Sequence, residues 1–212
     1  MKLLPLFLTA FLVGLTGAMT PGPLLTVTIS ETARKGFLAA PALVLGHVLL
    51  ELLLVLALLL GLSSLLSQSL FLVITGMVGG AALIWLGRRI ILDASQIQLD
   101  LTPVEGKTSL WGPILTGAAV SISNPYWILW WATIGISYIL LALQSGSQGL
   151  LFFLGGHFLA DFSWYLLIGG LVAAGKKFIS LRYYQWILRL SGFFLLALGG
   201  YFLLSSVQSV LS

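Results

Sequence analysis

Two pairs of ionisable residues lie inside stretches of the chain that are otherwise apolar. His47 precedes Glu51 by four residues, and His157 precedes Asp161 by the same spacing. Residues four apart share one face of a helix. A charge at the centre of a bilayer costs at least about 2.5 kcal/mol, so such residues usually have a function. Because histidine also titrates near neutral pH, we expect these four residues to couple proton movement to solute transport.

Two other interpretations of the same residues are open. In the first, a neutral histidine donates a hydrogen bond to its own acid, and each pair only holds helices together. In the second, His47, Glu51, His157 and Asp161 bind zinc or manganese, for which imidazoles and carboxylates are suitable ligands. The protein would then export a divalent cation. No His-Glu-x-x-His motif is present, so we do not expect a membrane metalloenzyme.

Prolines interrupt two of the longest apolar stretches. Pro21-Gly22-Pro23 lies in the first and Asn124-Pro125 in the fourth, and proline both removes an amide donor and clashes with the preceding turn. Backbone groups freed inside a bilayer must face protein or a water-filled cavity. There, the amino end of a half-helix can bind a carboxylate, and unwound carbonyls can bind a cation or an ammonium group. These five residues are therefore the predicted solute-binding site, although a simple packing kink would also explain the prolines.

Aromatic and small residues near these sites have simpler explanations. Trp127, Trp130 and Trp131 follow the second proline break and could line a pocket, but packing is the simplest role for them. Gly76 and Gly80 form a small-xxx-small pair that lets two helices approach closely. The sequence does not decide whether that neighbour lies in the same protomer or in a homodimer.

The elements that must position these residues are transmembrane helices. The chain has 212 residues, of which 59% are hydrophobic and 8% charged, against about a quarter charged in soluble domains. Apolar runs long enough to cross a bilayer recur along its whole length. We predict an all-α membrane protein with six transmembrane helices, at residues 3–30, 37–62, 69–92, 110–141, 149–174 and 184–207.

Three sequence features occur twice, in the same order, about one hundred residues apart. They are Leu15-Thr16-Gly17-Ala18 and Leu115-Thr116-Gly117-Ala118, the two His/acid pairs, and the glycine pairs Gly80/Gly87 and Gly192/Gly199. An ordered series of this kind indicates an internal duplication. Because each half has three spans, the second half must be inverted, as in many secondary transporters. We predict a first repeat at residues 1–92, a cytoplasmic linker at 93–109 and an inverted repeat at 110–212.

Basic residues mark one side of the predicted bundle. Nine of the ten lie in or beside loops one, three and five, namely Arg34, Lys35, Arg88, Arg89, Lys107, Lys176, Lys177, Arg182 and Arg189. Such loops are normally cytoplasmic, so both termini are expected outside. The net charge of +4 is spread over helix ends, so we expect no nucleic-acid partner. The absence of cysteine excludes disulfides and thiolate metal ligands.

The chain resembles the lysine exporter family of translocators over essentially all six predicted helices. The most specific segment is Thr20-Pro21-Gly22-Pro23, followed by Ser30, Gly36, the helix with Gly46, and Asn124-Pro125. The resemblance implies export of amino acids or related metabolites, driven by the proton or membrane-potential gradient. It also implies that the residues of the two breaks form the translocation site. Tyr126 stands where many members have a lysine, and paired histidines are not a general feature of the family.

Together these observations predict a secondary transporter in a prokaryotic cell membrane. It would export an amino acid or similar small metabolite by alternating access at a site between the repeats, with proton coupling. Its expected partners are the solute, protons and the lipid bilayer, and a homodimer is left open. We expect no enzymatic activity and no cofactor.

Overall fold

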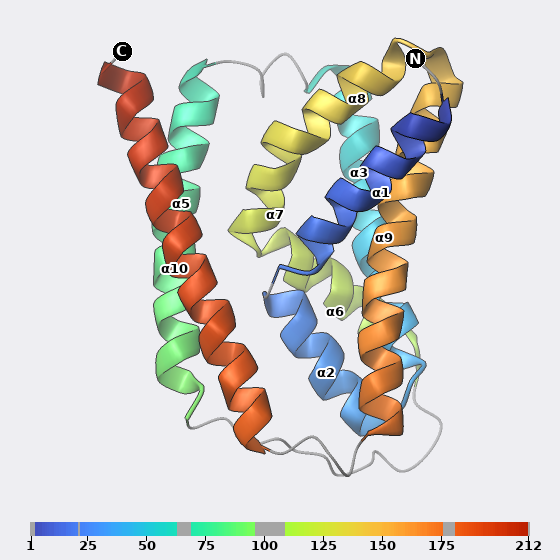
Figure 1. Ribbon diagram of the computed structural model, residues 1–212, viewed down its shortest axis with the longest axis vertical. Coiled ribbons are helices and arrows are strands. Elements are labelled where there is room, and N and C mark those ends of the chain that lie inside the picture. Colours follow the sequence, from blue (N-terminus) through green and yellow to red (C-terminus); the bar gives the residue numbers. More distant parts are fainter. Residues whose placement is uncertain (1–2, 21, 63–68, 96–108, 176–180, 212) are drawn as a thin grey trace.

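The computed structural model describes residues 3–20, 22–62, 69–95, 109–175 and 181–211, and every regular element in these ranges is a helix (Figure 1). Three segments are long and apolar enough to cross a membrane, and a bent pair of helices could form a fourth span. The segments are Ala39–Gly61, Tyr126–Leu143 and Gly146–Ala174, and the pair is α1 (Leu3–Ala18) with α2 (Pro23–Lys35). The third and sixth predicted helices correspond to α5 (Ser69–Asp93) and α10 (Leu181–Leu211). The protein is thus an all-α membrane protein.

The first predicted helix is broken where its prolines predict. The axes of α1 and α2 differ in direction by 76°. Gly22 lies between them with an extended backbone, and Pro23 begins α2, where its missing N–H leaves no intrahelical bond unmade. Pro21 lies outside the described residues. The helix α2 then continues to Lys35, beyond the predicted end at residue 30, and stops at Gly36, whose φ is 87°.

The fourth predicted helix is also broken at its proline. It consists of α6 (Trp111–Ile122), α7 (Pro125–Trp130), the π-helical turn η2 (Trp131–Gly135) and α8 (Ile136–Leu143). Asn124 is extended, and its side-chain Oδ1 accepts a hydrogen bond of 3.1 Å from the backbone N–H of Tyr126. Asparagine in this position caps a helix. Turns of the π type are frequent at functional sites.

The second helix of each half is unbroken through its centre and packs against a broken helix of the other half. These are α3 (Ala39–Ala57), which continues into the π-helical turn η1 (Leu58–Leu62), and α9 (Gly146–Ala174). The pairs are α3 with α6 and α9 with α1. At the first crossing, a Cβ on Gly46 would lie 1.8 Å from the carbonyl oxygen of Ile114, and one on Gly117 would lie 1.9 Å from that of Leu43. Glycine is required at both positions because backbone meets backbone there.

The helices α5 and α10 pack against each other in the left part of Figure 1. Their glycines contact reciprocally. A Cβ on Gly80 would lie 2.9 Å from the carbonyl oxygen of Gly199, and one on Gly199 would lie 2.6 Å from that of Gly80. Gly87 and Gly192 show the same relation, at 2.6 and 2.7 Å. The helix that approaches Gly80 therefore belongs to the same protomer, whereas the surroundings of Gly76 lie outside the described part.

The described basic residues gather at one end of the molecule. In Figure 1 the start of α1 and the end of α10 both lie at the top, on opposite sides of the view, and the end of α2, the end of α5 and the start of α10 lie at the bottom. These lower ends carry Arg34, Lys35, Arg88, Arg89, Arg182 and Arg189. The other four basic residues, Lys2, Lys107, Lys176 and Lys177, lie outside the described residues. The charge asymmetry read from the sequence is thus an asymmetry between the two ends of the fold.

Candidate functional site

A cavity of about 60 Å³ lies where the two helix breaks meet the middles of α3 and α9. Its lining includes both breaks and both His/acid pairs, through Gly22, Asn124, His47, Glu51, His157 and Asp161. A cavity of roughly 10–15 Å³ is enough to hold one water molecule, so this cavity has room for a few waters or one small polar group. Six residues that the sequence singled out in separate segments therefore line one cavity.

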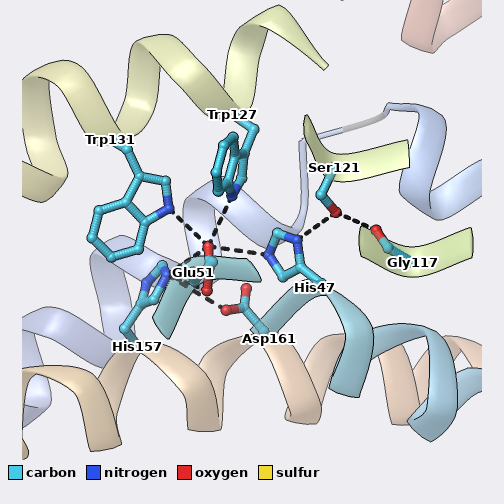
Figure 2. Close-up of polar contacts among 8 residues, drawn as sticks. All are labelled: His47, Glu51, Gly117, Ser121, Trp127, Trp131, His157 and Asp161. Atoms are coloured by element: carbon cyan, nitrogen blue, oxygen red, sulfur yellow. Dashed lines mark hydrogen bonds and ion pairs between the residues drawn. The ribbon is translucent and has the colours of Figure 1, made fainter. Parts of the chain in front are cut away.

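Glu51 is the centre of this site and is only 1% exposed. Its Oε1 accepts hydrogen bonds from the indole N–H groups of Trp131, at 2.9 Å, and Trp127, at 3.2 Å. The Nε2 atoms of His47 and His157 lie 3.2 and 3.3 Å from the same oxygen. Figure 2 shows the two indoles reaching Glu51 from one side and the two imidazoles from the others. A single carboxylate oxygen thus joins α3, the α7–η2 segment and α9.

The second ring nitrogen of His47, Nδ1, also has a polar partner. Its Nδ1 lies 2.7 Å from the hydroxyl of Ser121, and that hydroxyl lies 2.7 Å from the carbonyl oxygen of Gly117 (Figure 2). The serine can accept a hydrogen bond from a protonated Nδ1 while donating to Gly117, or it can donate to an unprotonated Nδ1. Both tautomers of His47 are therefore compatible with this contact, and so is the doubly protonated ring.

His157 connects the two acids. Its Nε2 lies 3.5 Å from Oδ2 of Asp161 and 3.3 Å from each oxygen of Glu51. The ring stacks on Trp130 at a centroid distance of 4.7 Å and on Phe153 at 6.0 Å. These stacked rings fix the plane of the imidazole, so that one nitrogen faces both carboxylates. The two predicted His/acid pairs consequently meet, and they form one buried network.

Three of the four predicted residues are arranged as metal ligands could be. One ligand atom each from His47, Glu51 and Asp161 lies within 4.8 Å of the others. One imidazole and two carboxylates suit zinc or manganese. However, the two indole N–H groups occupy Oε1 of Glu51, which leaves Oε2 as the ligand atom that Glu51 could offer.

The predicted solute-binding residues differ in how close they come to the cavity. Gly22 and Asn124 line it, and Pro23 begins α2 beside Gly22. Pro125 begins α7, and its side chain lies outside the described part of the structure, as does the whole of Pro21. The two breaks also touch each other, because the hydroxyls of Thr20 and Tyr126 lie 3.4 Å apart.

The sequence did not predict the roles of several site residues. Trp127 and Trp131 were assigned to packing, but both donate to Glu51. Their spacing of four was the available signal, because it places both indoles on one helical face. Ser121 gave no signal, since a serine in an apolar helix usually bonds to its own backbone.

The chain is similar to known proteins over most of its length. Residues 15–206 match the sequence model of a family described as LysE type translocator. The chain is also similar to the "Chemotactic transduction protein ChpE" of Pseudomonas aeruginosa, with 27% identity over 202 residues that cover 93% of this chain and 97% of that protein. No solved structure matches the chain.

Proposed function

The chain belongs to the LysE type translocator family, and from this premise we propose that it exports an amino acid or similar small metabolite by proton-coupled alternating access. One observation carries the proposal: both helix breaks and both His/acid pairs line the same cavity. Broken helices whose ends face a central site are a recurrent construction for binding small solutes in secondary transporters.

The proposed architecture is six transmembrane helices in two inverted repeats, residues 1–92 and 110–212. The packing of the helices supports it, because the first helix of each proposed repeat packs against the second helix of the other: α1 packs against α9, and α6 packs against α3. The glycine contacts support it too. In the proposed repeats Gly80 corresponds to Gly192, and Gly87 corresponds to Gly199. A two-fold axis relating the repeats would therefore turn the contact between Gly80 and Gly199 into a contact between Gly192 and Gly87. Both contacts occur.

The proposed orientation places loops one, three and five in the cytoplasm and both termini outside a prokaryotic cell membrane. Six described basic residues lie at one end of the fold, and cytoplasmic ends carry the excess of lysine and arginine. Solute would then enter from the basic end and leave at the end where the termini lie.

The amino end of α2 is the proposed site for the carboxylate of the solute. Gly22, its N-cap residue, makes no side-chain capping bond, whereas Asn124 caps α7 with its own side chain. Uncapped amide groups at the start of a helix attract anions. Pro21, Pro23 and Pro125 would contribute by keeping the two helices interrupted beside the cavity.

The proposed proton path is the buried network of His47, Glu51, His157 and Asp161, whose members follow one another at 3.2 to 3.5 Å. Alternating access would come from movement of one repeat against the other.

Efflux from proteoliposomes tests the proposal. Purified protein is reconstituted around a mixture of labelled amino acids and dipeptides, and a pH gradient is imposed with and without a protonophore. We expect at least one compound to leave faster than from protein-free liposomes, and the protonophore to slow it. Export is contradicted if no compound leaves faster, and proton coupling alone is contradicted if the protonophore has no effect.

Export of a divalent cation is the second candidate function. The mutual distances among His47, Glu51 and Asp161 favour it. The same proteoliposomes, loaded with labelled zinc or manganese, distinguish the two functions. Metal export predicts efflux of at least one of these ions, and equal rates from protein-containing and protein-free liposomes would exclude it.

A further inference from the structure

We propose that the two carboxylates have unequal roles: Glu51 is a fixed anchor, and Asp161 is the subsite that binds the ammonium group of the exported solute. This inference rests on the proposed function, since it concerns the same cavity. It assigns positioning roles to Trp127 and Trp131, which hold Glu51 but do not contact the solute through their N–H groups.

The first argument is a shortage of hydrogen-bond donors at Asp161. Oδ2 of Asp161 and Oε2 of Glu51 are buried and make no hydrogen bond. The described nitrogen that lies near both oxygens is Nε2 of His157, at 3.5 Å from the first and 3.3 Å from the second, and one N–H cannot satisfy both. Buried polar atoms in native proteins almost always have partners. An ammonium group supplies three N–H donors, which is what this part of the cavity lacks.

The second argument is that the two repeats differ where they should match. Trp127 and Trp131 stand two and six residues after Pro125, and they satisfy Glu51. The residues two and six after Pro23 are Leu25 and Ile29, which are buried and have no side-chain donor. The duplicated framework therefore supplies indole donors for Glu51 and supplies none at the equivalent positions of α2. Asp161 is thereby left available to a ligand.

The third argument concerns the walls of the cavity. Tyr126, Trp127 and Trp130 line it together with Asp161. Aromatic faces attract organic cations, and this attraction is stronger when the cation is desolvated. Asp161 itself is only 3% exposed, so a cation that reaches it must leave water. An acidic, aromatic cavity of about 60 Å³ matches an ammonium group, while the rest of the solute would occupy space opened by helix movement.

The same contacts favour an organic ammonium over a metal ion. Zinc requires several nitrogen or oxygen ligands at about 2.0–2.2 Å. Oε1 of Glu51 already accepts two indole N–H groups, and Nδ1 of His47 is paired with Ser121. A metal would have to rely on the remaining atoms, whereas an ammonium group needs only the unpaired oxygens at ordinary hydrogen-bond distances.

Tryptophan fluorescence of the full-length protein in detergent tests the subsite. Methylammonium chloride is the probe, because it isolates the ammonium group, and sodium chloride controls for ionic strength. We expect saturable quenching in the unmodified protein and a dissociation constant raised about tenfold or more by Asp161→Asn, which corresponds to about 1.4 kcal/mol. Asp161→Glu should restore part of the affinity and guards against a folding defect. Asp93→Asn, at an exposed carboxylate outside the cavity, should bind as the unmodified protein does.

The possible results separate this inference from the proposed function. If Asp161→Asn binds methylammonium with unchanged affinity, the subsite is wrong even where the unmodified protein exports amino acids. Quenching by zinc chloride that methylammonium cannot reverse would also overturn it, in favour of a metal site. If methylammonium binds as expected but no amino acid leaves proteoliposomes, the subsite stands and the export proposal fails.

Discussion

The hydrogen bond from Trp131 to Glu51 allows a quantitative test of the anchor. Trp131→Phe keeps a buried aromatic ring but removes the N–H that lies 2.9 Å from Oε1. Hydrogen bonds to charged groups contribute about 1.5–3 kcal/mol, but bonds between membrane helices average about 0.6 and reach about 1.7 kcal/mol. Three other nitrogens lie within 3.3 Å of the same oxygen and will compensate in part. We therefore expect a loss near the upper membrane value, about 1.5 kcal/mol.

The energy of this hydrogen bond can be separated from the energy of ring packing, because only the hydrogen bond depends on the charge of Glu51. A bond to an ionised acceptor is roughly twice as strong as a neutral one, so Trp131→Phe should cost about 0.7 kcal/mol less in a Glu51→Gln background than in the original protein. Trp164→Phe is the matched control, because the indole N–H of Trp164 is also buried and makes no hydrogen bond to the described residues. Its cost should be the same in both backgrounds.

The assay is equilibrium unfolding in mixed micelles, with sodium dodecyl sulfate titrated into dodecyl maltoside and helicity followed by circular dichroism. Each substitution is measured in both backgrounds, and the difference gives the coupling to Glu51. The reasoning is refuted if Trp131 and Trp164 show equal coupling to Glu51, because the indole N–H of Trp131 would then contribute nothing beyond ring packing.

Three further predictions concern packing, capping and orientation. Gly46→Ala should destabilise the fold, because the added Cβ would meet the backbone of α6. An added Cβ at Gly170 would have nothing within 4 Å, so Gly170→Ala should be neutral or stabilising by up to about 1 kcal/mol. Thermal melts in detergent measure both variants. Asn124→Ala should lose about 1 kcal/mol of capping energy, and Asn124→Asp should retain it, as the same melts will show. In this cysteine-free chain, Ser95→Cys should react with an impermeant maleimide only from the cytoplasm and Gln148→Cys only from outside; reaction from the opposite sides would reverse the orientation.

Local features of the site could be predicted from the sequence. A spacing of four placed His47 beside Glu51 and His157 beside Asp161, and these pairs lie 3.2 and 3.5 Å apart. Proline chemistry located the unwound residues before α7, beginning at Pro125. Both inferences depend on contacts within a few residues of the chain, where helical geometry is fixed.

Contacts between the halves could not be predicted in the same way. Glu51 bonds to residues 76, 80 and 106 positions away, and no periodicity relates such distant residues. The tryptophans were difficult for a further reason. An indole is mostly apolar surface with a single donor, so composition suggests packing and conceals the bond. The end of α2 was predicted five residues too early, because its final turns are polar and the helix stops only at Gly36.

Passage of solute through the central cavity can be tested most directly by filling it. Gly22 has an extended φ of −159° that any residue can adopt, and a Cβ there would have only ordinary contacts, the nearest 3.7 Å away. The backbone therefore tolerates a side chain at this position, and the side chain of Gly22→Leu should enter the cavity; circular dichroism and size-exclusion chromatography check that the purified variant is folded. Efflux of the labelled compounds from proteoliposomes should fall about tenfold or more, while Gly170→Ala leaves the rate unchanged. An undiminished rate in folded Gly22→Leu protein would contradict a translocation path between the two helix breaks.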